Sequence, residues 1–290
     1  MSQRDPSSAF RDQVVIVTGG SSGIGKQVTR DLLAEGALVT FTGHDPVRVD
    51  AARKEIAAIF PQVDAAVCDV RNMGQVSKTV ENVLAGRGRV DVLINNAGYA
   101  VYRSFEESSA AEVVDLLDVN LAGAMRMAKA VLPGMIRRRS GRIVNVASIG
   151  GETIITPNAV YCAAKHGMVA WTKALRYELG RFGVRVNVVC PGHTITHFHD
   201  DPTFRRRDPY RGRQSRSMSV ERVSTAILNA IRHDKIVSYV PAWLGLMTWT
   251  LNALPFATRP MWDSIATRRI EQLYEQIDAE RQHGPVGAAR

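Results

Sequence analysis

A hydroxyl, a phenol and an ammonium group stand close together in residues 148–165, SIGGETIITPNAVYCAAK. Tyr161 and Lys165 are four residues apart in a stretch, 158–182, whose apolar residues recur at helical spacing, so they should share one helix face. A neighbouring cation favours the phenolate, and we therefore expect the pKa of Tyr161 to lie below its ordinary value. Ser148 follows the strand-like residues 142–147 and can donate to a substrate oxygen. These groups suit proton exchange with an alcohol or a forming alkoxide while another group carries the hydride.

A Tyr-x-x-x-Lys pair is weak evidence alone, so this interpretation depends on a site for a hydride carrier. Residues 13–18 form a β-branched run typical of a strand buried on both faces, and residues 26–35 resume helical spacing. Between them, Gly19, Gly23 and Gly25 give the spacing Gly-x-x-x-Gly-x-Gly. A helix N-terminus with small residues lets a pyrophosphate approach its free N–H groups, although a turn used only for chain reversal is the alternative.

The same alternation continues along the chain. Strands are expected at 38–42, 64–68, 90–95 and 236–240, and helices at 47–59, 75–84, 111–139 and 219–231, the last capped by Ser219. Repeated βα units predict an α/β fold with one doubly wound parallel sheet. We expect a loose N-terminus at 1–12, a Rossmann-type domain at 13–240 and a C-terminal helical extension at 241–290.

Polar residues follow the third and fourth expected strands, at the sheet edge where ligands bind in such folds. Asp69 can accept from an adenine amino group, or it can be an ordinary cap or turn residue. Asn96, Ala97 and Gly98 let a ribose or a flat ring approach. Asn120 lies inside the expected helix 111–139, where its amide is either solvated or distorts the helix and holds a water beside Lys165.

These motifs together resemble, in order and spacing, the short-chain dehydrogenase/reductase (SDR) family over about residues 12–240. The resemblance implies the strand order 3-2-1-4-5-6-7 and a homodimer or homotetramer. It makes Tyr161 the general acid/base, Lys165 its electrostatic partner and nicotinamide ribose ligand, Ser148 the group that steadies the carbonyl, and Asn120 the holder of a relay water. The implied contacts to the dinucleotide are Gly19, Ser21, Ser22, Gly23, Ile24, Gly25, His44, Asp69, Val70, Asn96, Ala97, Gly98, Tyr161, Lys165, Pro191, Gly192, Thr194 and Thr196.

The choice of cofactor depends on the end of the second strand. NAD-preferring members usually carry an acid there, whereas this chain has Gly43 followed by His44, with Lys26 not far away in the sequence. This favours NADP(H) over NAD(H), while Asp45 and the lack of an arginine argue the other way.

Residues 193–218 fall where the family places its substrate lid. His193, His197 and His199 have no accompanying cysteine or carboxylate frame, so no metal site is expected. The lid arginines are expected to be a solvated face, with an anionic acyl carrier or membrane as the alternative; they are Arg205, Arg206, Arg207, Arg211, Arg213 and Arg216.

The tail is apolar after the last expected strand. Residues 236–258 carry no charge, and the thirteen residues 242–254 are too few for a membrane-spanning helix, which takes about twenty. A buried helix that completes the substrate pocket or a subunit contact is the first expectation. The second is a surface-lying membrane contact with Arg259, Arg268 and Arg269 nearby. The tail is similar to those of sphingoid-base ketoreductases and membrane-associated hydroxysteroid dehydrogenases.

Bulk properties narrow the function further. The chain has 290 residues and a net charge of +9, but its basic residues are dispersed, which argues against a nucleic-acid role. Three cysteines, Cys68, Cys162 and Cys190, lack metal spacing and fit a reducing compartment, and no secretory signal is seen. We therefore expect a cytoplasmic protein, with a place at the inner face of a membrane as the alternative. We expect NADPH-dependent reduction of an apolar or lipid-like ketone; the alternative is a non-catalytic dinucleotide-binding sensor or scaffold.

Overall fold

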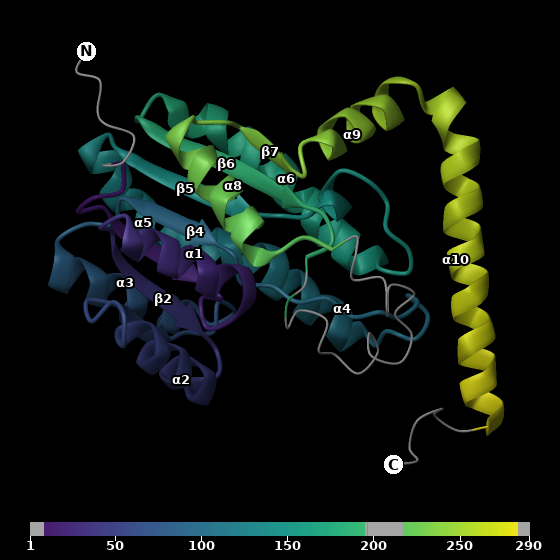
Figure 1. The fold of residues 1–290 in the computed structure, drawn as a ribbon, viewed down its shortest axis with the longest axis horizontal. Helices are drawn as coiled ribbons and strands as arrows, with labels where there is room; N and C mark the ends of the chain where they lie inside the picture. Colours follow the sequence, from purple (N-terminus) through teal and green to yellow (C-terminus); the bar gives the residue numbers. More distant parts are fainter. Residues whose placement is uncertain (1–8, 195, 197–216, 284–290) are drawn as a thin grey trace.

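A seven-stranded parallel sheet forms the centre of the molecule in the computed structural model, which describes residues 9–194, 196 and 217–283 (Figure 1). Its strand order, β3-β2-β1-β4-β5-β6-β7, confirms the predicted one. The strands are β1 (Val14–Thr18), β2 (Leu38–Gly43), β3 (Asp64–Val67), β4 (Val92–Asn95), β5 (Gly141–Val146), β6 (Val184–Pro191) and β7 (Val237–Val240).

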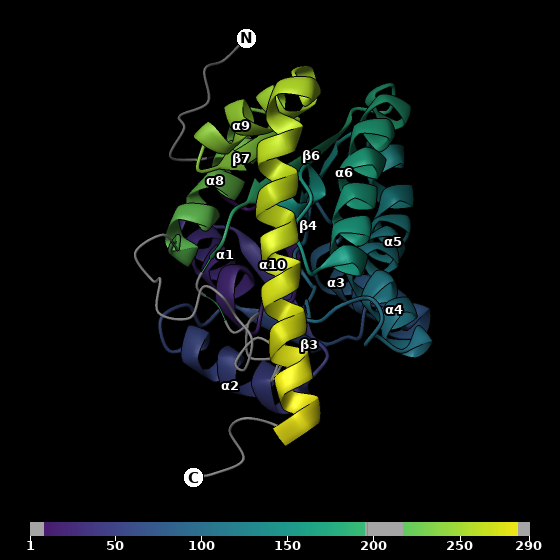
Figure 2. The same ribbon diagram turned by 90° about the vertical axis from the view of Figure 1, so that its right-hand side faces the viewer.

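Helices cover both faces of the sheet, and the reason is visible in β1. All five of its residues are buried; Val15 and Val17 belong to one core cluster, and Val14 and Ile16 to another. Successive strand side chains point to opposite faces, so a run of β-branched residues needs cover on both. Figure 2 shows the two layers. One holds α1 (Gly23–Ala34), α2 (Pro46–Ala57) and α8 (Val220–Arg232), and the other holds α3 (Met73–Arg87), α5 (Gly123–Arg138) and α6 (Ala159–Gly180).

The expected helix 111–139 is interrupted, so the prediction of one continuous helix is wrong. It divides into α4 (Ala110–Leu117), a π-helical turn η2 (Asp118–Ala122) and α5. Asn120 lies in the π-helical turn, where its side-chain amide donates to the carbonyl of Leu116 at 3.0 Å. The side-chain amide therefore competes with backbone N–H groups for a helix carbonyl, as the sequence interpretation allowed. Such turns often mark functional positions.

The C-terminal extension consists of α9 (Trp243–Ala253) and α10 (Pro255–His283). In Figures 1 and 2, α9 lies beside β7 and α10 crosses the edge of the sheet apart from the helical layers. Leu244 and Thr248 of α9 are buried, whereas Trp243 and Trp249 are each 62% exposed. Only one side of α9 therefore packs on the domain in the single chain, and the expectation that 242–254 completes the substrate pocket or a subunit contact stays a prediction.

No described helix is both long and apolar enough to cross a bilayer.

Candidate active site

The glycine turn after β1 forms a cradle that side chains would fill. Gly19 and Gly23 have φ of 65° and 52°, the left-handed region that favours glycine. A Cβ on Gly19 would come within 2.9 Å of the Cα of Ala97, and one on Gly25 would strike the carbonyl of Gly19. The helix α1 begins at Gly23 with no side-chain cap from Ser22 and no acid in its first turn. Its N-terminal N–H groups are thus suited to an anion.

The residues after β4 brace this turn. The backbone N–H groups of Asn96 and Ala97 both donate to the hydroxyl of Thr18, each at 3.0 Å. The side-chain amide of Asn96 donates to the carbonyls of Thr18 and Gly19, each at 3.1 Å. Asn96 therefore fixes the shape of the glycine turn, a role that the sequence did not indicate.

Thr196 lies against the same turn from the other side. Its Cβ and Cγ2 would be 3.2 Å from a Cβ on Gly23, so it faces the N-terminus of α1. Pro191 ends β6, the N–H of Gly192 donates to the carbonyl of Val240 at 2.8 Å, and Thr194 is buried. These expected cofactor contacts thus lie at the carboxyl edge of the sheet.

Ser148, Tyr161 and Lys165 come together at this edge. Ser148 caps the short helix η3 (Ile149–Gly151), and its hydroxyl forms a hydrogen bond with the phenol of Tyr161. The ammonium of Lys165 lies 5.7 Å from the centre of the Tyr161 ring, so the two share a helix face as predicted. Lys165 is 3% exposed and donates to the carbonyl of Val146 at 3.1 Å.

The pKa of Tyr161 differs from the sequence expectation in direction. Burial raises it above the ordinary value, and the hydrogen bond from Ser148 opposes that rise only in part. Burial also lowers the pKa of Lys165 to about 8. The predicted lowering of the Tyr161 pKa by the lysine is therefore wrong for the protein alone, because loss of hydration disfavours both charged forms.

Asn120 adds a buried oxygen to this group. Its side chain is 0% exposed; the amide nitrogen donates to the carbonyls of Tyr99 at 2.8 Å and Leu116 at 3.0 Å. The side-chain oxygen has no hydrogen-bond partner among the described residues. A Cβ on Gly98 would lie 2.5 Å from that oxygen and 3.5 Å from the ammonium of Lys165, so both atoms border one point beside Gly98. A buried acceptor of this kind commonly holds a water.

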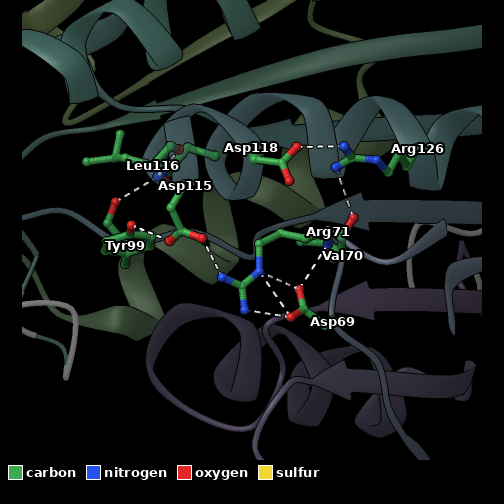
Figure 3. A network of polar contacts seen from close by, with 9 residues as sticks. Asp69, Val70, Arg71, Tyr99, Asp115, Leu116, Asp118 and Arg126 are labelled. Atoms are coloured by element: carbon green, nitrogen blue, oxygen red, sulfur yellow. Dashed lines mark hydrogen bonds and ion pairs between the residues drawn. The ribbon is translucent and has the colours of Figure 1, made fainter. Parts of the chain in front are cut away.

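A polar network joins Asn120 to the expected adenine site (Figure 3). The hydroxyl of Tyr99 donates to Asp115 at 2.6 Å, and Arg71 makes ion pairs with both Asp115 and Asp69. The guanidinium of Arg71 holds the pKa of Asp69 below its usual range. The Asp69 carboxylate is thus already engaged, and Arg71, Tyr99 and Asp115 are site neighbours that sequence reasoning missed, since no motif marks them.

The end of β2 has little room for an acidic side chain. A Cβ on Gly43 would lie 2.9 Å from Cγ2 of Val49 and 3.0 Å from the hydroxyl of Ser21. Asp45, which the sequence left as an argument for NAD, accepts from the N–H groups of Val47 at 2.9 Å and Arg48 at 3.2 Å. Its carboxylate is therefore the N-cap of α2. His44 is exposed beside this position.

The lid expected at 193–218 is described only at its ends. His193 makes a 2.7 Å hydrogen bond with Ser217. His197, His199 and the lid arginines lie outside the described residues. Within the described residues, no group of three or more metal-ligating side chains is found.

The C-terminal helix α10 contributes two residues near Tyr161 that the sequence did not single out. Leu273 and Ile277 form a buried cluster with Ala100 and Tyr102, and Tyr161 packs against it. The same helix carries exposed apolar residues, such as Phe256, Met261 and Ile265, so no single apolar stripe marked the buried pair.

Comparison with known proteins identifies related chains. The family profile described as "short chain dehydrogenase" matches residues 13–203. A putative ketoacyl reductase of Streptomyces coelicolor is 40% identical over 186 residues, which cover 63% of this chain and 71% of the relative. The 3-ketodihydrosphingosine reductase of Bacteroides thetaiotaomicron is 35% identical over 192 residues, 66% of this chain and 68% of the relative. A crystal structure of an actinorhodin polyketide ketoreductase with NADPH superposes with a TM-score of 0.72 at 33% identity, covering 81% of this chain and 97% of that one.

Proposed function

This chain belongs to the short chain dehydrogenase family, and on that premise we propose that it reduces an apolar ketone to a secondary alcohol with NADPH. The observation that carries the proposal is the convergence of Ser148, Tyr161, Lys165 and Asn120 beside a glycine turn that is open to an anion. Hydride transfer needs both a carrier and a proton donor, and both requirements meet at one edge of the sheet.

The residues around the glycine turn fit a nicotinamide dinucleotide. The N-terminus of α1 would hold the pyrophosphate, Thr196 would close over it, and Lys165 would donate to the nicotinamide ribose. Asp69 and Val70 would border the adenine, and Ala97 and Gly98 the ribose beside it; the remaining contacts are those expected above. When bound, the dinucleotide supplies the hydride.

Tyr161 would deliver the proton. Because burial raises its pKa, the phenol is protonated at neutral pH, the form required to donate to a forming alkoxide. Ser148 would hold the carbonyl oxygen within reach. A water that donates to the unpartnered side-chain oxygen of Asn120 would lie beside the ammonium of Lys165, and through it a proton from solvent would replace the one that Tyr161 gives up.

Support for NADPH comes from the end of β2. An acid at position 43 would collide with Ser21 and Val49, and Asp45 is engaged as a helix cap. This leaves His44, which is exposed, as the residue that would face a 2'-phosphate.

The substrate class rests on the surroundings of Tyr161 and on the relatives. Tyr161 lines a hollow whose other walls include Val101, Phe105, Leu116 and Val160. Relatives named for ketoacyl and 3-ketodihydrosphingosine reduction point the same way. A panel of 3-ketoacyl, sphingoid, steroid and small-ring ketones, followed by NADPH consumption, would identify the preferred class.

Replacing Tyr161 by Phe tests the proton donor. Turnover should fall by at least about 10²-fold, the usual contribution of a placed acid, while NADPH binding measured by fluorescence stays unchanged. Tyr177→Phe is the matched control, because Tyr177 is 82% exposed on the same helix. Full activity in Tyr161→Phe would overturn the assignment.

Cytoplasmic location with contact to an anionic membrane surface is a second part of the proposal. The observation that favours it is the outer side of α9, where Trp243, Leu246 and Trp249 are exposed, followed by Phe256, which is 95% exposed. Exposed aromatic side chains with arginines nearby suit a helix that lies in a membrane interface.

Assembly as a homodimer or homotetramer would be tested by sedimentation.

A further inference from the structure

The helix α10 touches the domain near its C-terminal end through only two fully buried side chains. Leu273 and Ile277 are each 2% exposed, while every other described side chain of this helix is half-buried or exposed. They are four residues apart and so lie on one face. Other apolar residues of this helix, such as Met261 and Ile265, are exposed, so the burial of these two marks the place where α10 meets a partner surface.

That partner surface adjoins the active site. Leu273 and Ile277 pack against Ala100 and Tyr102, in the segment that follows Gly98, and Tyr161 packs against the same cluster. The cluster to which the pair belongs therefore borders the proton donor. A helix far away in the sequence thus contributes to the apolar cluster beside the reacting group, and Figure 2 shows α10 lying across the edge of the sheet.

Polar contacts on the rim set the register of α10. The hydroxyl of Tyr274 donates to Glu106 at 3.3 Å, and Arg281 makes a 3.5 Å ion pair with the same carboxylate. Both contacts are exposed, so each contributes little to stability. They orient α10 without fixing it firmly, which leaves the apolar contact free to be exchanged.

The hollow that the described residues form beside Tyr161 is small. The hollow that Tyr161 lines holds about 10 Å³, roughly the room for one water. An adjoining hollow of about 160 Å³ is lined by Tyr99, Val113, Leu116 and Val160 but not by Tyr161. The bulk of a ketone must therefore replace a side-chain contact, and an aliphatic group replaces another aliphatic group at little cost.

We infer that Leu273 and Ile277 determine substrate specificity: the aliphatic chain of the ketone binds against them and takes the place of their contact with Tyr102. This inference rests on the proposed ketone reduction. It assigns the preferred substrate to ketones that carry an aliphatic chain of several carbons, because a short ketone would leave the pair and Tyr102 in contact. A charged group at the same position would lose its hydration without a partner.

The test is the full-length double variant Leu273→Ala/Ile277→Ala against the matched control Met261→Ala/Ile265→Ala, whose residues are exposed on the same helix. The readout is kcat/KM for 2-decanone divided by that for 2-butanone, with NADPH oxidation as the signal. Removing six aliphatic carbons from Leu273 and Ile277 should lower this ratio by at least about tenfold, the effect of one lost methylene contact in an apolar pocket. The control should keep the wild-type ratio. An unchanged ratio in Leu273→Ala/Ile277→Ala would overturn the inference.

A binding measurement separates this inference from the proposed reaction. The dissociation constants of the same two ketones, measured by calorimetry in a Tyr161→Phe background, should show the same loss of preference. If wild type reduces neither ketone but the double variant still loses its binding preference for 2-decanone over 2-butanone, the proposed reaction is refuted and the role of Leu273 and Ile277 is supported. Should the double alanine variant not fold, Leu273→Val/Ile277→Val should lower both ratios by a smaller factor, and no change there would also overturn the inference.

Discussion

Substituting Gly98 by Ala adds one methyl group beside Asn120 and Lys165 and so tests the arrangement of the active site. The new Cβ would lie 2.5 Å from the side-chain oxygen of Asn120, well inside van der Waals contact, and 3.5 Å from the ammonium of Lys165. Asn120 cannot move aside easily, because it is fully buried and its amide nitrogen is held by two carbonyls. The methyl would also occupy the point at which the relay water is proposed to bind.

The expected cost follows from this crowding. Overpacking a tight interior costs about 1–3 kcal/mol, and about 2 kcal/mol corresponds to a melting temperature roughly 4–8 °C lower in a domain of this size. Turnover should fall by about 10²-fold or more, since proton delivery to Tyr161 is interrupted. Thermal unfolding and NADPH oxidation with the best ketone of the panel measure the two effects.

Gly86→Ala is the matched control. Gly86 lies near the end of α3, and nothing stands within 4 Å of a Cβ placed there. Alanine in a helix is preferred over glycine by about 0.5–1 kcal/mol, so this variant should be slightly more stable and fully active. If Gly98→Ala matched Gly86→Ala in both measurements, the proposed geometry of Asn120 and Lys165 would be refuted.

Further predictions concern charge and the exposed tail. Lys165 has a pKa of about 8 in the folded protein and 10.5 in the unfolded chain, so its buried charge destabilises the folded protein at low pH. Between pH 8 and 10.5 the free energy of unfolding of wild type, measured with urea, should rise by about 3 kcal/mol relative to that of Lys165→Met. No rise would contradict the burial argument. His44→Asp should lower the ratio of kcat/KM for NADPH to that for NADH by at least about tenfold; an unchanged ratio would remove His44 from cofactor selection. Burial alone would raise the pKa of Asp234, but hydrogen bonds from Arg176 and Asn187 bring it to about 2. Wild type should therefore be more stable than Asp234→Asn by at most about 2 kcal/mol, and this advantage should disappear as the pH falls from about 4 to 2. Acid titrations followed by circular dichroism measure it. Trp249→Ser should reduce flotation with phosphatidylglycerol-containing vesicles, whereas equal flotation would exclude α9 as the contact.

The sheet could be predicted because two signals in the sequence mark its strands. In β1 every residue is β-branched, which predicts the strand, and the glycines that follow it predict the turn. Tyr161 and Lys165 were brought together correctly because helical spacing is local. Ser148 could be added because parallel strands end at a common edge.

The pKa of Tyr161 could not be predicted from spacing, because spacing gives the neighbouring cation but not the loss of hydration. In the structure the ammonium of Lys165 donates to Val146, and burial outweighs its effect on the phenol. Asp45 is the opposite case. Its position directly before Pro46 is typical of a helix N-cap, and that signal was available in the sequence.

The contact of α10 with the segment beside Tyr161 could not be predicted for a different reason. The 29-residue helix carries other apolar residues, among them Phe256, Met261 and Ile265, which are exposed, so no single apolar face distinguishes Leu273 and Ile277. The strongly apolar 242–254 drew attention instead, yet most of its large side chains face outward in the single chain. Which segment meets Tyr161 depends on the path of the chain after β7, which no local pattern specifies.

The π-helical turn at 118–122 makes the site sensitive to chain length as well as to residue type. It accommodates more residues per turn than a regular helix, so deleting Val119 would allow α4 and α5 to merge into one α-helix. The additional residue of a π-helical turn is taken up within the turn, so α4 and α5 could keep the faces that they bury. Asn120 would lose the widened turn from which its amide reaches the carbonyls of Tyr99 and Leu116, so a one-residue deletion here should abolish activity at a smaller cost in stability.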